Sequence, residues 1–233
     1  MIEIRLSGPG KNALGSEIMA TVMQQIEAAN GAPLLFTADG DAFSAGLNLK
    51  EVGGLDEAGM EAFLERLQLF FKTIWNYPGP TAAAVNGHAI AGGCILAMCC
   101  DVAIATDNEK ARIGLNEVAI GLRFPPSLLR FVRAKVSPAN VDEIVLGAGL
   151  HSPMDALRLG LVHGVSSDPE SEARARLQKL ARHPADAYGA TKYDMRNGVM
   201  DATAEERRRF NEEVVPFWTS PELKAMIANI LGG

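Results

Sequence analysis

The alternation of short apolar segments with longer amphipathic ones constrains the fold of this chain most strongly. Residues 2–6 and 34–38 have the apolar character of β-strands. Between them Ile18, Val22 and Ile26 recur every four residues, which is the spacing of one face of a helix. A strand, a helix and a second strand in this order favour parallel pairing with a crossover helix.

The same pattern continues to about residue 168. Ser16 is the predicted cap of the first helix and Gly31 its predicted stop. Residues 56–75 predict a longer helix, after which a strand resumes at residues 81–85. Further strands are predicted at residues 102–105 and 161–165.

From about residue 169 onward the pattern is helical. The predicted helices cover residues 170–183, 204–215 and 221–231. We therefore predict an α/β core over residues 1–168 and a helical C-terminal region over residues 169–233.

The charge of the chain gives no overall basic field for nucleic acid. The 233 residues include 22 basic and 28 acidic side chains, a net charge of −6. The longest basic cluster, Arg207 to Arg209, follows Glu205 and Glu206 on a predicted helix and is interpreted as a solvated face. No nucleic-acid partner is expected.

The apolar segments are too short to predict a membrane span. Asp101 ends the apolar stretch that begins near Thr81, before it reaches the ~18 residues of a membrane helix. The N-terminus lacks the pattern of a secretory peptide, so a cytoplasmic location and no membrane partner are expected.

The three cysteines lie in one segment of small residues. Cys94, Cys99 and Cys100 are odd in number and form no paired metal-binding spacing with nearby His88. They are interpreted as small buried hydrophobes, and no metal site is predicted.

Four short blocks carry a resemblance that covers nearly the whole chain. They are KNAL at residues 11–14, AFSAGLNL at 42–49, VNGHAIAGGC at 85–94 and IGLNEVAIGL at 113–122, followed by GLVHGV at 160–165. In this order and spacing, the chain resembles the crotonase, or enoyl-CoA hydratase/isomerase, family. The resemblance implies a spiral of ββα units, an acyl-CoA thioester as substrate, and no metal or separate cofactor.

The two glycine-containing blocks correspond to an oxyanion hole in the resembled family. The resemblance assigns the backbone N–H groups of Leu47 and Gly92 to the thioester oxygen, where negative charge develops. A helix beginning near Gly92 would add its N-terminal dipole. Either block alone would be better explained as a tight turn or a point of close packing, but finding both blocks in the family's order reverses this preference.

Glu117 is the predicted catalytic acid and base. It occupies the position of the catalytic carboxylate in the resembled motif, although most lone glutamates are surface residues. Its apolar neighbours in sequence predict a raised pKa, which suits a group that removes and returns a proton.

Ile95 distinguishes between activities within the family. Hydratases that resemble this chain place a second glutamate there, which handles water, and isoleucine cannot replace it. The resemblance therefore favours an isomerase that converts 3-enoyl-CoA to 2-enoyl-CoA with one glutamate. A 2-enoyl-CoA hydratase and a noncatalytic acyl-CoA-binding paralogue remain as alternatives.

The resemblance also predicts where the two parts of the substrate lie. CoA is expected along two segments, at Asn12, Ala13, Leu14, Ala42, Phe43 and Ala45. Ile95, Leu122 and Phe124 are candidates for the acyl pocket, with core packing an equally good explanation for the last two.

Four other polar residues are interpreted as structural. Ser44 lacks the context of a nucleophile, and His88 is expected to be a satisfied polar residue. Asp101 is predicted to be a turn or capping carboxylate, with a role in orienting the site left open. Asn116 is expected to fix the turn before Glu117.

The C-terminal region is predicted to build a homotrimer or a dimer of trimers. The segment from Phe210 to Trp218 contains apolar residues that could cover a neighbouring subunit, and the trimer number comes from the family resemblance. The competing explanation is that this segment folds back over the chain's own active site.

Overall fold

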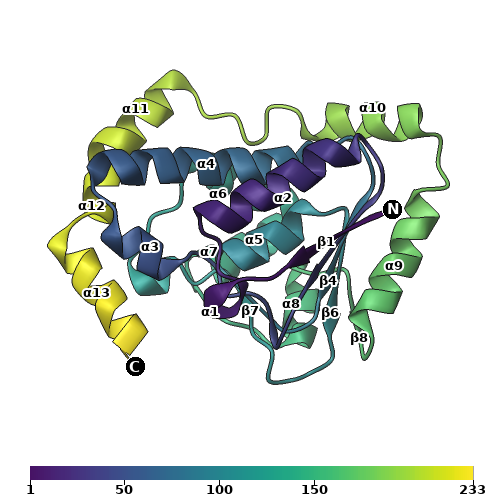
Figure 1. The fold of residues 1–233 in the computed structure, drawn as a ribbon, viewed down its shortest axis with the longest axis horizontal. Helices are drawn as coiled ribbons and strands as arrows, with labels where there is room; N and C mark the ends of the chain where they lie inside the picture. Colours follow the sequence, from purple (N-terminus) through teal and green to yellow (C-terminus); the bar gives the residue numbers. More distant parts are fainter. Residues whose placement is uncertain (233) are drawn as a thin grey trace.

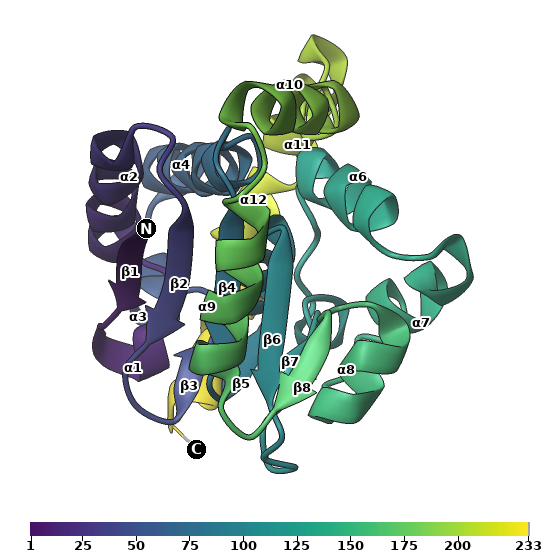
Figure 2. The same ribbon diagram turned by 90° about the vertical axis from the view of Figure 1, so that its right-hand side faces the viewer.

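Two parallel sheets form the centre of the computed structural model, which describes residues 1–232 (Figures 1 and 2). The larger sheet has the order β1-β2-β4-β6-β8 and the smaller one the order β3-β5-β7. The five strands of the larger sheet are β1 (Ile2–Leu6), β2 (Leu34–Ala38), β4 (Thr81–Val85), β6 (Val102–Thr106) and β8 (Gly164–Ser166). The smaller sheet contains β3 (Ala42–Ser44), β5 (His88–Ile90) and β7 (Ile113–Gly114).

The two sheets are built by a repeated ββα unit. In each of the pairs β2/β3, β4/β5 and β6/β7, the first strand joins the larger sheet and the second joins the smaller one. Helices α3 (Leu49–Gly54) and α4 (Glu57–Trp75) separate the first two pairs, and α5 (Gly92–Cys99) separates the next two. The predicted α/β spiral of ββα units is therefore confirmed.

Strand β4 shows why the larger sheet is covered on both faces. Ala82 and Ala84 pack toward α9 (Pro169–Leu180), whereas Ala83 and Val85 belong to the main core on the other face. Side chains alternate between the faces of a strand, so small residues on one side allow α9 to approach closely. Figure 2 shows α9 in front of the sheet.

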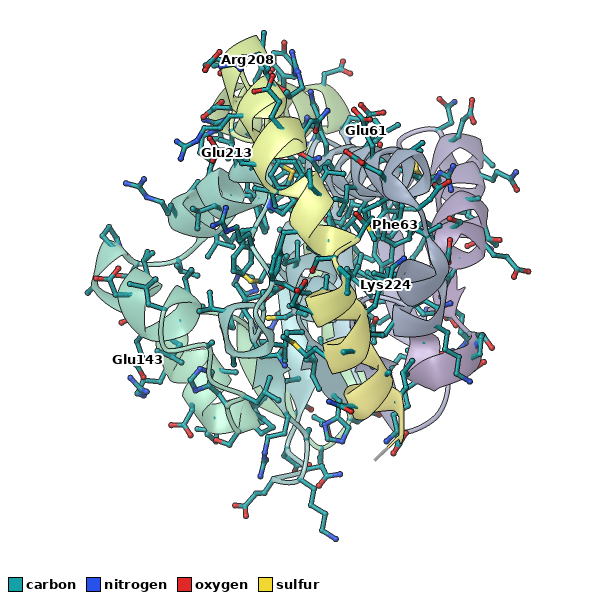
Figure 3. All side chains as sticks on the ribbon, turned by 90° about the vertical axis from the view of Figure 1, so that its left-hand side faces the viewer. Glu61, Phe63, Glu143, Arg208, Glu213 and Lys224 are labelled. Carbon is teal, nitrogen blue, oxygen red and sulfur yellow. The ribbon has the colours of Figure 1, made fainter. Side chains whose placement is uncertain are left out.

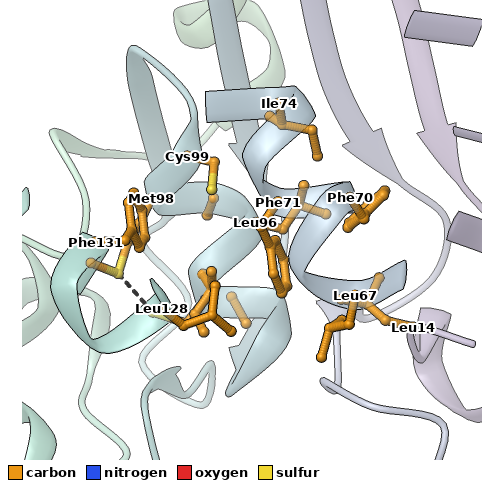
Figure 4. Close-up of a cluster of buried hydrophobic side chains, with 14 of the residues drawn as sticks. Leu14, Leu67, Phe70, Phe71, Ile74, Leu96, Met98, Cys99, Leu128 and Phe131 are labelled. Carbon is orange, nitrogen blue, oxygen red and sulfur yellow. Dashed lines mark hydrogen bonds between the residues drawn. The ribbon is translucent and has the colours of Figure 1, made fainter. Parts of the chain in front are cut away.

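The main core lies between α4, α5 and α6 (Pro126–Lys135). Figure 4 shows Phe71 of α4 beside Leu96 of α5, with Phe131 of α6 on the other side. The helices contribute large apolar side chains here because their hydrophobic faces turn inward. This packing fixes the beginning of α5.

The remaining elements between residues 9 and 159 are short. They are α1 (Pro9–Asn12), η1 (Val118–Ile120), η2 (Pro138–Asn140), α7 (Val141–Val145) and α8 (Pro153–Leu159). The strand predicted at residues 161–165 is shorter and begins later, because α8 ends at Gly160 and residues 161–163 connect it to β8. Gly160 adopts φ +82°, the left-handed conformation that ends many helices.

Helix α2 (Ser16–Ala29) begins differently from the prediction. Ser16 is its first residue rather than its cap, and Gly15 occupies the cap position. The Glu51 carboxylate accepts hydrogen bonds from the backbone N–H of Ser16, at 2.9 Å, and from its hydroxyl group. A carboxylate distant in sequence thus replaces the local cap at the positive end of the helix. The predicted stop is confirmed, since Gly31, at φ +82°, follows the C-cap Asn30.

The C-terminal region contains two helices that the sequence pattern missed. It consists of α9, α10 (Ala185–Arg196), α11 (Ala204–Glu213), α12 (Val215–Trp218) and α13 (Pro221–Gly232). The missed helices are the four-residue α12 and the longer α10, whose buried residues are Lys192 and Arg196. A helix that buries cations shows no apolar period in its sequence, so hydrophobic spacing could not identify it.

Asp101 holds α10 against the sheet. Its carboxylate pairs with Lys192 at 2.9 Å and Arg196 at 2.7 Å, and it accepts hydrogen bonds from the Tyr188 hydroxyl and the Thr81 backbone, both at 2.7 Å. Burial alone would raise the pKa of this carboxyl group, but the charges of Lys192 and Arg196 lower it below its usual value. Asp101 was predicted to be a turn or capping carboxylate, and in the structure it joins the first residue of β4 to a distant helix.

Most apolar residues of the segment from Phe210 to Trp218 are buried within the chain itself. Phe210, Val215 and Trp218 are each at most 5% exposed. Helix α12 packs on α4, and α13 packs on α3. Figure 3 shows this yellow segment, which carries Lys224, running across the face that contains Phe63 of α4. These side chains fold back over their own chain, as the competing explanation proposed.

The three cysteines belong to the core of the protein. Cys94, Cys99 and Cys100 are free and fully buried, in agreement with their interpretation as small core residues. In the described part of the chain, no helix combines the length and apolar character needed to cross a membrane.

We predict that Asp101→Asn lowers the free energy of unfolding by about 3 kcal/mol, because it leaves two buried cations without their charge partner. Urea denaturation of the variant beside Asp107→Asn, an exposed aspartate that forms no ion pair among the described residues, measures the effect. Equal denaturation midpoints for the wild type and Asp101→Asn would contradict the anchoring role.

Candidate active site

The predicted catalytic residues meet at the carboxyl ends of the three strands of the smaller sheet. Leu47 follows β3, Gly92 follows β5 and Glu117 follows β7, each within three residues of the strand end. Because β3, β5 and β7 are parallel neighbours, their carboxyl ends lie at one edge. Ligands of open α/β sheets commonly bind at such an edge.

The backbone N–H of Leu47 is directed toward this edge. Leu47 forms a parallel bridge with Leu14, in which the Leu14 N–H donates to the Gly46 carbonyl at 2.6 Å and the Asn48 N–H donates to the Leu14 carbonyl at 3.0 Å. In this pattern the amide of Leu47 itself points away from Leu14. Among the described residues it has no backbone acceptor, so it is available to a ligand.

The backbone N–H of Gly92 opens the first turn of α5. The first amides of a helix have no partner within the helix and carry its positive dipole end. Gly46, at φ +91°, brings the two loops together: a Cβ on Gly46 would lie 2.9 Å from the Ile90 carbonyl oxygen and 3.6 Å from the Gly92 nitrogen. The two predicted donors are therefore on adjacent segments.

A second glycine fixes how closely α5 approaches β3. A Cβ on Gly93 would lie 2.3 Å from the Ser44 carbonyl oxygen and 2.8 Å from the Ser44 Cβ. Backbone atoms cannot yield to such a contact, so only glycine fits here. Gly93 was quoted in the sequence only as part of a motif, and its packing role emerges from the structure.

Glu117 is a buried carboxylate with an unpartnered oxygen. Its residue is 9% exposed, and Oε2 has no hydrogen-bond partner among the described residues. Burial raises the pKa of Glu117 to about 7, against a smaller lowering by its own backbone N–H. The Leu122 N–H donates to the Glu117 carbonyl at 2.8 Å, which holds the residue at the start of a tight turn ending at Gly121.

A cavity of about 240 Å³ opens beside these groups. Its lining contains both predicted donors, Glu117, and all three residues predicted for the acyl pocket, namely Ile95, Leu122 and Phe124. Glu117 is the sole carboxylate among the described residues that line it. The rest of the wall is mostly apolar and includes Leu49, Leu64, Leu67, Phe71, Leu128 and Trp218.

The six residues predicted to bind CoA divide into two groups. Ala13 and Ala45 are partly exposed, and Ala45 lines the cavity. Four others have side chains that are 4% exposed or less and so lie behind the surface: Asn12, Leu14, Ala42 and Phe43. These four cannot present side chains to CoA, because folding uses their side chains to build the core beneath the segment.

Asn12 illustrates this supporting role. Its side-chain amide donates to the carbonyl oxygens of Asp39 at 2.8 Å and Ala42 at 2.9 Å, and its Oδ1 accepts from the Gly8 N–H at 3.1 Å. The side chain thus ties the first block to the second. The Ser44 hydroxyl adds a bond to the Asn12 carbonyl at 2.8 Å, which is a structural contact.

His88 begins β5, at the end of the strand opposite the site, whereas Asn116 directly precedes Glu117 and lines the cavity. The His88 Nδ1 accepts a hydrogen bond from the Arg112 N–H at 3.1 Å, in agreement with a satisfied structural histidine. Asn116 lines the cavity, and its Oδ1 is buried without a partner among the described residues. Asn116 therefore faces the same space as Glu117, in addition to preceding its turn.

Sequence analysis missed the helical wall of the cavity. Leu64, Leu67 and Phe71 come from α4, and Trp218 comes from α12. The apolar period of α4 predicts a buried face without indicating that part of it lines a site. Trp218 was noted only as part of an apolar segment, and nothing local connects it with residue 117.

We predict that Glu117→Gln stabilises the protein at high pH. The pKa of Glu117 is raised from 4.5 to about 7 by folding. The wild type therefore loses stability as pH rises through about 7, because ionising the buried group becomes a cost of about 3 kcal/mol. At pH 8.5 the variant should unfold at a higher urea concentration than the wild type. The difference between their midpoints should close as the pH falls toward 5.

The exposed Glu109→Gln variant is the matched control for this measurement. It should track the wild type at every pH. A gap between Glu117→Gln and the wild type that is independent of pH would show that the carboxyl group is not buried in the way described.

Comparison with known proteins identifies the family. The family model for enoyl-CoA hydratase/isomerase matches residues 1–222. A putative enoyl-CoA hydratase of Thermus thermophilus is 32% identical over 191 residues, covering 78% of this chain and 74% of the relative. The mouse mitochondrial enoyl-CoA delta isomerase 1 is 30% identical over 167 residues, covering 71% of this chain and 58% of the mouse protein.

The fold has a close counterpart among solved structures. The crystal structure of human mitochondrial delta3-delta2-enoyl-CoA isomerase superimposes with a TM-score of 0.91 at 24% identity, covering 99% of this chain and 92% of the human one. At this identity the likeness concerns the fold. The family match extends from the first strand of the sheet to α13, and so includes every segment that builds the cavity. The chain belongs to the enoyl-CoA hydratase/isomerase family.

Proposed function

We propose that this enzyme moves the double bond of a 3-enoyl-CoA to the 2-position. The observation that carries the proposal is that one carboxylate, Glu117, lines a mostly apolar cavity among the described residues. Ile95, 2% exposed, lines the same cavity where a second carboxylate would be needed to activate water. Relatives carry hydratase and isomerase names, so the site itself is the basis for the choice.

The first step is removal of a proton from C2 of the thioester by Glu117. The electron pair of the C2–H bond becomes part of a dienolate that spans the acyl chain and the thioester carbonyl. The Leu47 and Gly92 N–H groups would donate to the carbonyl oxygen, where charge accumulates. These donors do not titrate, and the backbone holds them in place before the substrate arrives.

The second step returns the same proton to C4. A double bond then lies between C2 and C3, in conjugation with the carbonyl, and Glu117 is again ionised. A pKa of about 7 suits both steps, because a base near neutrality accepts and releases a proton with similar ease. The apolar wall supports this by keeping water away from the dienolate.

Hydration of a 2-enoyl-CoA is the second candidate function. It is favoured by the Thermus relative's name and by the unpartnered Asn116 Oδ1, a polar atom that could hold water near Glu117. Isoleucine at position 95 argues against it.

We also propose a trimeric assembly, whose contacts would have to involve surfaces other than the apolar side chains that α12 buries within its own chain.

We predict that Glu117→Gln lowers isomerase turnover by about 10²–10⁴-fold while leaving affinity for a saturated acyl-CoA unchanged. The amide keeps the shape of the side chain and cannot take the proton. Product-resolved assays with 3-enoyl- and 2-enoyl-CoA substrates provide the measurement. Formation of 3-hydroxyacyl-CoA as the main wild-type product would support the hydratase, and ligand binding without turnover would support a noncatalytic role.

We further predict that Gly93→Ala lowers turnover by about 10²–10³-fold, the usual effect of losing one oxyanion donor. The added Cβ meets the Ser44 carbonyl and must displace the start of α5, including the Gly92 N–H. Gly54→Ala is the matched control, since a Cβ there meets no atom within 4 Å. Wild-type turnover in a folded Gly93→Ala variant would contradict the placement of this donor.

A further inference from the structure

The cavity beside Glu117 has one wall made of tightly packed core side chains. Leu64 and Leu67 of α4 and Leu128 of α6 line the cavity, and each is at most 3% exposed. We call these three residues the far wall. Figure 4 shows Leu67 and Leu128 among the side chains of the buried core. The far wall therefore belongs to the interior of the protein rather than to a surface loop.

Phe71 relates the far wall to the catalytic groups. A Cβ on Gly92 would lie 3.6 Å from Phe71 Cζ, so this ring is beside the residue that supplies one predicted donor. Leu67 and Leu64 follow Phe71 on the same face of α4, one and two turns farther along the helix. The helix rises about 10 Å between residues 71 and 64. The wall thus leads away from the position expected for the thioester.

A buried polar contact holds the two helices of the far wall together. Ser127, 3% exposed, donates a hydrogen bond from its hydroxyl group to Gln68 Oε1 at 2.7 Å. Gln68 Nε2 donates in turn to the Leu64 carbonyl at 3.2 Å. Ser127 precedes Leu128 and Gln68 follows Leu67, so the contact joins the backbone positions that carry the wall. Separating α4 from α6 would leave these polar groups unpaired, which costs free energy.

The volume of the cavity determines how much of a substrate it can hold. The cavity measures about 240 Å³. A methylene group is about the size of a water molecule, whose share of liquid volume is ~30 Å³, so the cavity takes about eight non-hydrogen atoms. The thioester sulfur and oxygen are among these atoms, because Leu47 and Gly92, the predicted donors, line the same cavity. About six acyl carbons remain.

We propose that the far wall stops the acyl chain at about six carbons and makes the enzyme selective for short-chain 3-enoyl-CoA substrates. This inference rests on the proposed function and specifies the substrate class of the same site. A longer chain must push apart side chains that are already packed, which strains the core. The hydrogen bond between Ser127 and Gln68 resists that movement.

Binding of saturated thioesters of increasing length measures this limit without turnover. By calorimetry, the affinity of the wild type should rise about fourfold per added methylene group from butyryl-CoA to hexanoyl-CoA. It should then fall by about tenfold or more between hexanoyl-CoA and dodecanoyl-CoA, because the longer chain overpacks the core. Turnover of the corresponding 3-enoyl-CoA substrates should follow the same order.

Variants of the far wall and of its hydrogen bond test the cause of the limit. Leu128→Ala should move the length optimum upward by about two carbons, since it removes an isopropyl group from the wall. Ser127→Ala should reduce the preference for hexanoyl-CoA over dodecanoyl-CoA severalfold, because it releases α6 from α4. The matched control is Leu159→Ala, the same truncation at a fully buried residue of α8 outside the described lining, and it should keep the wild-type length profile.

The outcomes separate this inference from the proposed isomerase activity. Equal affinities of the wild type for hexanoyl-CoA and dodecanoyl-CoA would overturn the length limit, with the chain leaving past the exposed Arg123 instead. A profile that Leu128→Ala and Ser127→Ala both leave unchanged would overturn the role of the far wall. Hydration of 2-hexenoyl-CoA as the main reaction would overturn the proposed function and leave the length limit standing. The wild-type profile needs no variant, so it tests the proposal even if Leu128→Ala fails to fold.

Discussion

The close approach of α5 to β3 is the contact on which the site depends. Gly93 lies against the Ser44 backbone, and Gly46 lies against Ile90, so two loops meet without intervening side chains. This proximity places the amides of Leu47 and Gly92 side by side at the edge of the smaller sheet. The large apolar side chains of α4 and α6 hold α5 there from behind.

The same packing buries the carboxyl group of Glu117 and thereby raises the free energy of its ionised form. Glu117 faces an apolar cavity, and burial moves its pKa to about 7. That shift lowers stability at neutral and higher pH, but it gives the carboxyl group an acidity suited to exchanging protons. The large apolar core around α4, α5 and α6 offsets such a cost through the surface that it buries.

The C-terminal region completes the cavity from the far end of the chain. Trp218 reaches the wall because α12 folds back onto α4, while α9 covers the opposite face of the larger sheet. The packing of the core therefore continues past residue 168, where the sequence pattern becomes helical. The shape of the cavity and the stability of the fold are coupled here, since residues that close the cavity also bury apolar surface.

The sequence by itself determined the strand and helix alternation and the family, because strand periodicity and short motifs are local properties. It also singled out Leu47, Gly92, Glu117 and Ile95, which line one cavity in the structure. It did not reveal α10, whose buried face consists of Lys192 and Arg196, nor the Glu51 carboxylate at the start of α2. Only the tertiary structure decided that Phe43 lies in the core and that Trp218 lines the cavity. The raised pKa of Glu117 was predicted from its apolar neighbours in sequence, and in the structure burial is its cause. Burial and contacts between distant segments are properties of the packed chain, and no local pattern encodes them.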